Sequence, residues 1–232
     1  MKYALVTGST RGIGFAIAAG LADAGYFVFT NGRGDMRAKP PGERYRHIKA
    51  DLSGLEGVNA LAETVLRRAP KLDCLVLNAG ATCRKPFAET EYADWQAVMD
   101  TNVNMPFFLV RRLLTGMADG GSILFVSSAM GLAPHATSVS YGVSKAAVNM
   151  LARSLVKEFA PRGIRVNVIC PGFIDTEWQR EKPVWLREKI EGKVALGRFG
   201  SPGEVADMCL ALIENSYVNG AVLSVDGGYD ME

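Results

Sequence analysis

Thr7-Gly8-Ser9-Thr10-Arg11-Gly12-Ile13-Gly14 is the stretch that decides the fold. The apolar run before it, residues 3–6, is typical of a short β-strand, and residues 15–24 repeat apolar side chains at the spacing of one helix face. The glycines therefore lie on a turn between a strand and a helix, where the backbone turns tightly and the two elements approach closely. The N-terminus of such a helix offers free N–H groups and a partial positive charge, so we expect it to bind the pyrophosphate of a dinucleotide.

The spacing of these glycines is G-x-x-x-G-x-G, which meets the common G-x-G-x-x-G fingerprint only in part. The alternative is a glycine-rich turn that binds nothing. We favour the phosphate site because strand, glycines and helix follow one another in the order that such a site requires.

A second motif lies in the middle of the chain, where Ser128 follows an apolar run and Tyr141 stands four positions before Lys145. Residues 141–159 have the apolar pattern of a helix, so the side chains of Tyr141 and Lys145 lie one turn apart on the same face. A tyrosine has a pKa of about 10, and we expect the nearby ammonium group to lower it. The end of a strand is where an open α/β sheet binds its ligand, so Ser128 is placed to contact a substrate. The alternative is a surface Tyr–Lys pair beside an unrelated serine.

These motifs, in this order, resemble those of the short-chain dehydrogenase/reductase family along essentially the whole chain. Residues 7–14 match the family's T-G-x-x-x-G-x-G loop, residues 77–80 match its N-N-A-G segment with Leu77 in place of the first Asn, and residues 221–228 match its closing strand. The resemblance implies a set of cofactor-binding residues, to which we add Arg33 because of its charge. The set is Gly8, Ser9, Thr10, Arg11, Gly12, Ile13, Gly14, Arg33, Asp51, Leu52, Asn78, Ala79, Gly80, Tyr141, Lys145, Pro171, Gly172, Ile174 and Thr176.

The resemblance also implies an enzyme that interconverts a secondary alcohol and a ketone with a nicotinamide cofactor. Its catalytic residues would be Asn102, Ser128, Tyr141 and Lys145. Ser128 and Tyr141 would hydrogen-bond the carbonyl oxygen, and Tyr141 would transfer the proton. Lys145 would also hold the nicotinamide ribose, and Asn102 matches the family residue that seats a water leading to solvent. Two other functions stay open: a nucleotide-binding sensor without turnover, and a lyase or epimerase.

Seven β-like runs alternate with helical patterns through most of the 232 residues, near 3–7, 26–30, 45–49, 73–77, 122–127, 164–169 and 222–225. This alternation predicts an α/β fold of the doubly wound Rossmann type, in which helices cover both faces of a parallel sheet. We expect one domain, residues 1–232. Between Arg33 and Asp51, Pro40-Pro41-Gly42 predicts a loop in place of the usual crossover helix.

Composition limits the partners. The net charge of +2 and the absence of a basic block argue against nucleic acid, and no run of about 18 apolar residues predicts a membrane span. The first strand begins almost at Met1, which leaves no room for a signal peptide. The four cysteines lack metal-ligand spacing, and Cys74 and Cys170 lie in apolar strands, so we expect no metal, buried free thiols and a cytoplasmic protein.

The substrate is less constrained. Residues 173–200 are expected to form a lid over it, for which Trp178, Trp185, Leu186 and Ile190 provide an apolar cover or merely packing against the body. Residues 198–202 and the C-terminal tail resemble 3-oxoacyl-carrier-protein reductases. The basic cluster of those enzymes is missing from residues 117–121, although Arg111, Arg112 and Arg180 are candidate substitutes. A free ketone, a hydroxysteroid or a sugar-derived alcohol also stays open.

The second strand indicates which cofactor is preferred. An NAD site places an acidic residue at the end of this strand to bind the ribose 2′-hydroxyl, but Gly32 stands there and Arg33 follows. Together with Arg11, Arg33 provides two guanidinium groups for a 2′-phosphate, so NADP(H) is expected over NAD(H). The alternative is that both arginines are solvated and Asp35 reaches the ribose. By resemblance, helices around 94–117 and 141–159 are expected to pair in a homotetramer or homodimer.

Overall fold

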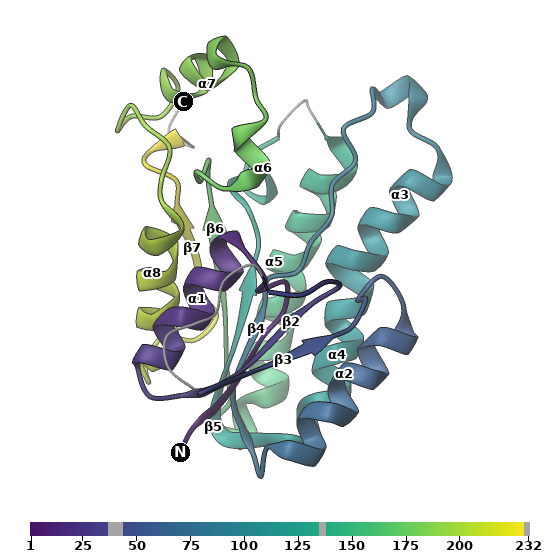
Figure 1. Ribbon diagram of the computed structural model, residues 1–232, viewed down its shortest axis with the longest axis vertical. Helices are drawn as coiled ribbons and strands as arrows, with labels where there is room; N and C mark the ends of the chain where they lie inside the picture. Colours follow the sequence, from purple (N-terminus) through teal and green to yellow (C-terminus); the bar gives the residue numbers. More distant parts are fainter. Residues whose placement is uncertain (37–43, 135–137, 230–232) are drawn as a thin grey trace.

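The computed structural model describes residues 1–36, 44–134 and 138–229, which contain a seven-stranded sheet in the order β3-β2-β1-β4-β5-β6-β7 (Figure 1). Every neighbouring pair of strands is parallel. The strands are β1 (Tyr3–Val6), β2 (Phe27–Gly32), β3 (Tyr45–Lys49), β4 (Leu72–Leu77), β5 (Met117–Val126), β6 (Arg165–Pro171) and β7 (Val222–Val225). The predicted doubly wound α/β fold is confirmed.

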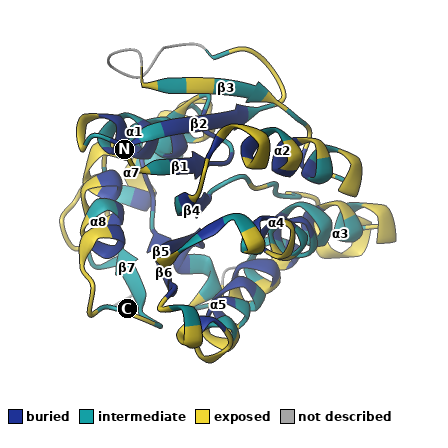
Figure 2. Ribbon diagram, turned by 90° about the horizontal axis from the view of Figure 1, so that it is seen from below, coloured by how far each residue is buried: buried dark blue, intermediate teal, exposed yellow. Residues whose placement is uncertain are grey.

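Helices cover both faces of the sheet, as the view in Figure 2 shows. The helices are α1 (Gly12–Asp23), α2 (Leu55–Arg68), α3 (Tyr92–Met99), α4 (Met105–Leu113), α5 (Val139–Phe159), α6 (Glu177–Arg180), α7 (Val184–Glu191) and α8 (Pro202–Glu214). On one face α1 and α8 pack together over the core that includes Ile17, Leu21 and Val205, while α2, α4 and α5 cover the larger core on the other face. The strands between them are apolar on both sides because both faces are buried.

Two element boundaries differ from the sequence expectation. Helix α1 begins at Gly12 rather than at residue 15, so two glycines of the loop belong to its first turn. The helix expected around residues 94–117 is divided into α3, a π-helical stretch over Asp100–Asn104, and α4, which has Pro106 in its first turn. The loop predicted at Pro40-Pro41-Gly42 lies outside the described residues.

The site is positioned by a change of direction in the sheet. After β1 the chain builds β2 and β3 towards one edge, and then returns to place β4 on the other side of β1. The loops that leave the carboxyl ends of β1 and β4 therefore separate, and such a switch point is where open α/β sheets form their ligand crevice. In Figure 1 the segment with α6 and α7 and the segment with α3 rise on opposite sides of this edge.

Candidate active site

The glycine loop after β1 has the backbone geometry that only glycine adopts easily. Gly8 and Gly12 have φ values of +61° and +57°. A Cβ on Gly14 would lie 2.4 Å from both the Asn78 side-chain nitrogen and the Gly8 carbonyl oxygen, so this residue allows α1 to approach the loop. No side chain caps the N-terminus of α1. The loop thus leaves backbone N–H groups and a small concave surface for a phosphate.

Hydrogen bonds from β4 fix the shape of this loop. The Thr7 hydroxyl accepts from the backbone N–H groups of Asn78 and Ala79 at 3.0 and 3.1 Å. The Asn78 amide donates to the carbonyl oxygens of Thr7 and Gly8, both at 3.0 Å. Ser9 is fully buried behind the loop, where its hydroxyl donates to the Val6 carbonyl oxygen at 2.7 Å. Its side chain therefore supports the loop from within the protein.

A cleft of about 1310 Å³ is lined by the glycine loop and by residues of the segment 173–200. This exceeds the usual range for one drug-sized ligand and leaves space for a dinucleotide together with a substrate. Of the predicted site residues, Ser9 and Asn102 do not line it, and all the others do: Gly8, Thr10, Arg11, Gly12, Ile13, Gly14, Arg33, Asp51, Leu52, Asn78, Ala79, Gly80, Ser128, Tyr141, Lys145, Pro171, Gly172, Ile174 and Thr176.

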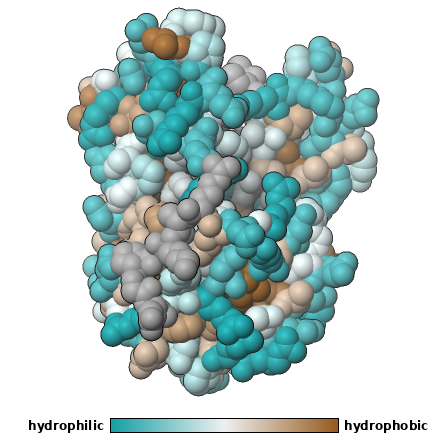
Figure 3. Space-filling model, viewed as in Figure 1, coloured by the Kyte–Doolittle hydropathy of each residue, from teal (hydrophilic) through white to brown (hydrophobic). Residues whose placement is uncertain are grey.

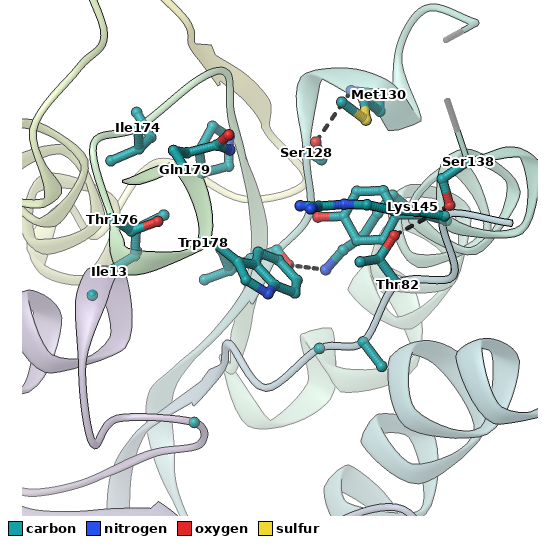
Figure 4. A pocket seen from close by; sticks show the side chains of 18 of the residues that line it. Ile13, Thr82, Ser128, Met130, Ser138, Lys145, Ile174, Thr176, Trp178 and Gln179 are labelled. Carbon is teal, nitrogen blue, oxygen red and sulfur yellow. Dashed lines mark hydrogen bonds between the residues drawn. The ribbon is translucent and has the colours of Figure 1, made fainter. Parts of the chain in front are cut away.

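Ser128, Tyr141 and Lys145 all line this cleft, and Figure 4 shows Ser128 and Lys145 in it. Ser128 stands two residues beyond β5, and the other two lie one turn apart on α5. The Lys145 ammonium donates to the carbonyl oxygen of Val126 at 2.8 Å and lies 5.5 Å from the centre of the Tyr141 ring. Ser128 is thereby joined into one polar cluster with Tyr141 and Lys145, which follow it by 13 and 17 positions.

The acid–base properties of this cluster differ from the sequence expectation. Burial raises the pKa of Tyr141 to about 12, and the hydrogen bond with Ser128 only partly opposes this effect. Burial also lowers the pKa of Lys145 to about 8. Desolvation of the phenol therefore dominates, and the expected lowering of the tyrosine pKa by Lys145 is wrong.

Asn102 lies behind the acid–base cluster on the π-helical stretch and is buried. Its side-chain oxygen accepts from the N–H of Ala81 at 2.8 Å, and its side-chain nitrogen donates to the Ala81 carbonyl oxygen and the Ser144 hydroxyl, both at 2.9 Å. A Cβ on Gly80 would lie within 3.3 Å of the Asn102 oxygen and 3.7 Å of the Lys145 nitrogen. Asn102 thus joins the loop after β4 to the helix that carries Tyr141.

The sequence left two roles for the apolar residues of the segment 173–200: covering the substrate or packing against the body. Both kinds of contact occur in the structure. Trp178 of α6 contacts the Tyr141 ring edge-on, with 6.4 Å between ring centres. Ile190 and Leu186 also line the cleft, and they belong to an apolar cluster that includes Met130 and Tyr229 outside the segment, while Trp185 is 63% exposed. Three of the four apolar residues therefore line the cleft, two of these also pack in an apolar cluster, and Trp185 faces solvent.

Several lining residues were not singled out by the sequence. Thr82 and Ser138 lie beside Lys145 in Figure 4, with their hydroxyls 3.2 Å apart. Gln179 of α6 also lines the cleft, and its side-chain oxygen is buried without a hydrogen-bond partner in the described part of the chain. Single polar residues carry no periodic signal, so only the folded structure shows that these three share the site.

The charges at the glycine-loop end are partly engaged with each other. The Arg11 guanidinium donates to the Glu177 carboxylate at 3.0 Å and so connects the loop to α6. Arg33 is exposed and lines the cleft without an ion-pair partner among the described residues. Asp35 pairs with Lys49 at 2.7 Å, which directs this carboxylate towards β3.

Comparison with known proteins agrees with this geometry. The family model described as enoyl-(acyl carrier protein) reductase matches residues 8–230. A 3-oxoacyl-[acyl-carrier-protein] reductase of Aquifex aeolicus is 36% identical, with 98% of this chain and 96% of that protein covered. A 2-dehydro-3-deoxy-D-gluconate 5-dehydrogenase of Pseudoalteromonas atlantica is 35% identical, with 98% and 95% covered.

A solved structure shows the same fold. The Pseudomonas aeruginosa RhlG/NADP active-site complex is 31% identical, with a TM-score of 0.90 and with 99% of this chain and 96% of that chain covered. The chain belongs to the short-chain dehydrogenase/reductase family, and it is an NAD(P)-dependent oxidoreductase. No helix in the described ranges is long and apolar enough to cross a membrane.

Proposed function

We propose that this enzyme interconverts a secondary alcohol and a ketone and that NADP(H) is its preferred cofactor. One observation carries the proposal: Ser128, Tyr141 and Lys145 line the same cleft as the glycine loop. The cofactor, when bound, supplies or accepts the hydride. The glycine loop fits its pyrophosphate, because the N-terminus of α1 lines the cleft and has no side-chain cap, so its backbone N–H groups are available to an anion.

The side chains of the chain itself supply hydrogen bonding and proton transfer. Ser128 and Tyr141 donate to the carbonyl oxygen of the substrate, and the raised pKa keeps the phenol protonated at neutral pH, in the state that donates. As the oxygen gains negative charge, Tyr141 passes its proton to it. The Lys145 ammonium near the ring then stabilises the phenolate. Asn102 keeps the loop after β4 in register with α5, and oxidation follows the same path in reverse.

The preference for NADP(H) rests on the end of β2. A Cβ on Gly32 would lie 2.4 Å from a methyl carbon of Thr10, so an acidic side chain has no room there while Thr10 keeps its place. Arg33 follows directly and is free to pair with a 2′-phosphate. Asp35, the alternative ribose ligand, is held by Lys49. A guanidinium–phosphate pair contributes about 1.5–3 kcal/mol, or roughly ten- to a hundredfold in affinity.

A 3-oxoacyl thioester is a second candidate substrate, favoured by the likeness to 3-oxoacyl-[acyl-carrier-protein] reductases. Arg111 and Arg112 are exposed on α4, where an acidic carrier can reach them. Arg180, the third candidate, is exposed at the end of α6. Assays with a 3-oxoacyl thioester and with free ketones distinguish the two substrate classes.

Replacing Tyr141 by Phe tests the proposed chemistry, because it removes the proton donor and keeps the ring. We expect kcat to fall by roughly 10²–10⁴, with the affinity for NADPH nearly unchanged. Tyr217→Phe is the matched control, since Tyr217 is 97% exposed. Turnover is followed by the absorbance of the reduced cofactor in a screen of alcohols and ketones. If Tyr141→Phe keeps more than half of the wild-type turnover, the assignment is wrong.

A further inference from the structure

Thr82 lines the cleft close to the acid–base cluster. It lies on the loop that follows β4, and its hydroxyl is 3.2 Å from the hydroxyl of Ser138. Ser138 is the residue before α5 and stands three positions before Tyr141, so these two residues lie about one helical turn apart. Figure 4 shows the Thr82–Ser138 pair beside Lys145. The Thr82 hydroxyl is therefore near the reacting centre without belonging to the groups that transfer the proton.

Hydrogen bonds fix the backbone on both sides of Thr82. The Asn102 side chain accepts from the N–H of Ala81 at 2.8 Å and donates to the carbonyl oxygen of Ala81 at 2.9 Å. On the other side, the carbonyl oxygen of Cys83 accepts from the Ser138 hydroxyl. Thr82 is thus held between the buried Asn102 and the start of α5. A ligand that binds to it has little further ordering of the protein to offset.

The partners of Ser138 decide what the Thr82 hydroxyl offers to a ligand. Each hydroxyl group has one hydrogen to donate and two lone pairs to accept with. The Ser138 hydrogen lies on the bond to the Cys83 carbonyl oxygen, because that oxygen has no hydrogen of its own. In the contact between the two hydroxyls Thr82 is therefore the donor. Its hydrogen is used there, and only lone pairs remain for a ligand in the cleft.

The reacting centre has the opposite hydrogen-bonding character. The Ser128 hydroxyl accepts from the N–H of Met130 at 3.2 Å, so its hydrogen is left for Tyr141 or for a ligand. Ser128 and Tyr141 share one hydrogen bond and have two hydroxyl hydrogens between them, so one hydrogen remains for a carbonyl oxygen. The cleft thus offers a donor where the ketone oxygen binds and an acceptor at Thr82.

The surface around the cleft agrees with a polar ligand. In Figure 3 the face is hollowed between the part with α6 and α7 and the part with α3, and hydrophilic residues predominate on both sides. The loop that carries Thr82 leads from β4 towards α3. This side of the hollow therefore suits a substrate that has polar groups besides its carbonyl group.

We propose that the substrate carries a hydroxyl group besides its carbonyl group, and that this hydroxyl donates to the Thr82 oxygen while the carbonyl oxygen lies at Ser128 and Tyr141. The proposal rests on the proposed function and narrows its substrate class to hydroxy ketones, or to diols in the direction of oxidation. A ketone without the hydroxyl leaves the Thr82 lone pairs without a donor, and such a mismatch reduces kcat/KM. Thr82 is therefore a specificity residue.

Matched pairs of ketones test the proposed class of substrate. Hydroxyacetone is compared with butanone, and 4-hydroxy-2-butanone with 2-pentanone, because each pair exchanges a hydroxyl for a methyl group. The absorbance of NADPH gives kcat/KM for reduction of each ketone. We expect at least one hydroxy ketone to exceed its partner about fivefold or more. Equal values within both pairs, a preference for the partners that lack the hydroxyl, or no reduction of either hydroxy ketone overturns the proposal.

Substitutions of Thr82 assign this preference to its hydroxyl. Thr82→Val exchanges the hydroxyl for a methyl group and is expected to reduce the preference about fivefold, whereas Thr82→Ser keeps the oxygen and should retain it. Thr64→Val is the matched control, because the Thr64 hydroxyl donates to the Ala60 carbonyl oxygen within α2 and lies outside the cleft. A preference that survives Thr82→Val, or that Thr82→Ser loses to the same extent, contradicts the assignment.

Two features of this experiment keep its outcomes separate. A purely structural role of Thr82 would lower kcat/KM for both members of a pair and leave their ratio unchanged, so the ratio reports binding of the hydroxyl. Reduction of butanone that Tyr141→Phe abolishes would support the proposed function on its own. Failure of the hydroxy ketone proposal is thus distinguishable from failure of the proposed function.

Discussion

Burial of the Lys145 side chain lowers the free energy of unfolding. Its side chain is only 4% exposed, its ammonium donates to the Val126 carbonyl oxygen, and its pKa falls from the ordinary 10.5 to about 8. The folded protein therefore binds fewer protons at this site than the unfolded chain between these two pH values. The resulting loss of stability is fully present below pH 8 and disappears as the pH rises to 10.5.

A Lys145→Met variant is expected to reveal this cost. At pH 7 the substitution should raise the free energy of unfolding relative to the wild type by up to about 3 kcal/mol, less the lost hydrogen bond. The difference should shrink steadily between pH 8 and pH 10.5, because the wild-type lysine becomes neutral in both states. Urea denaturation of both proteins across this range measures it. A difference that does not change with pH would show that Lys145 is not desolvated, and loss of activity in the variant is expected in either case.

Arg33 is the residue on which cofactor preference is expected to depend. Arg33→Asp places a carboxylate beside the 2′-position, so it should repel NADPH and leave NADH nearly unaffected. We expect the ratio of kcat/KM for NADPH to that for NADH to fall at least tenfold. Arg46→Asp, which changes an exposed charge on the neighbouring β3 and does not line the cleft, is the control. Equal kcat/KM for the two cofactors in the wild type would refute the preference itself.

The residue scale also shows what a sequence can and cannot predict about this site. Gly8 and Gly14 were identifiable because a turn between strand and helix demands residues without side chains, and both make the expected close contacts in the structure. The raised pKa of Tyr141 could not be predicted from the sequence, since it depends on how much protein surrounds the phenol. The spacing of Tyr141 and Lys145 shows that they are neighbours, but it contains no information about desolvation.

At the scale of elements, the contact between α1 and the loop beneath it is the tightest constraint. Gly14→Ala would bring a methyl group to 2.4 Å from the Asn78 side chain and the Gly8 carbonyl oxygen, so α1 must shift. We expect a loss of stability of about 1–3 kcal/mol, together with weaker NADP⁺ binding. Denaturation and calorimetry measure the two effects.

Gly203→Ala is the matched control for this substitution. Gly203 lies in the first turn of α8, where an added Cβ meets only the Ser201 hydroxyl at an ordinary 3.8 Å. Alanine has the higher helix propensity, so the control should be neutral or slightly stabilising. If Gly14→Ala behaves in the same way, the close packing of α1 against the loop does not constrain this protein.

Elements with a strong apolar period were predictable, and the others were not. The strands and α5 follow directly from runs of apolar residues, which the parallel sheet buries on both faces. The π-helical stretch over Asp100–Asn104 has no comparable signal. It depends on contacts of Asn102 with Ala81 and Ser144, which are 21 and 42 positions away, so only the tertiary structure reveals it.

At the scale of the molecule, the cleft is a product of topology. Its walls come from the loops after β1 and β4, from α5 and from the segment with α6 and α7. The order of these parts along the chain could be predicted from the sequence motifs. Their convergence in space follows from the parallel sheet and its switch point. The salt bridge between Arg11 and Glu177, 166 positions apart, illustrates a contact that no local pattern indicates.

The exposed apolar surface of α4 and α5 carries the last prediction. Phe107, Val143 and Met150 are 41%, 44% and 63% exposed on these two helices. From the family resemblance, we propose that these two helices pair with those of a second copy across a two-fold axis, within a tetramer, which would cover these side chains. Light scattering at micromolar concentration should give the mass of four chains.

Met150→Glu should reduce this mass, because it places a charge in the pairing surface, whereas the exposed Tyr217→Phe should not change it. The affinity for NADP⁺ is expected to survive in the Met150 variant, since this residue does not line the cleft. A wild-type mass equal to one chain would exclude the assembly. A tetramer that Met150→Glu leaves intact would instead assign the contact to other surfaces.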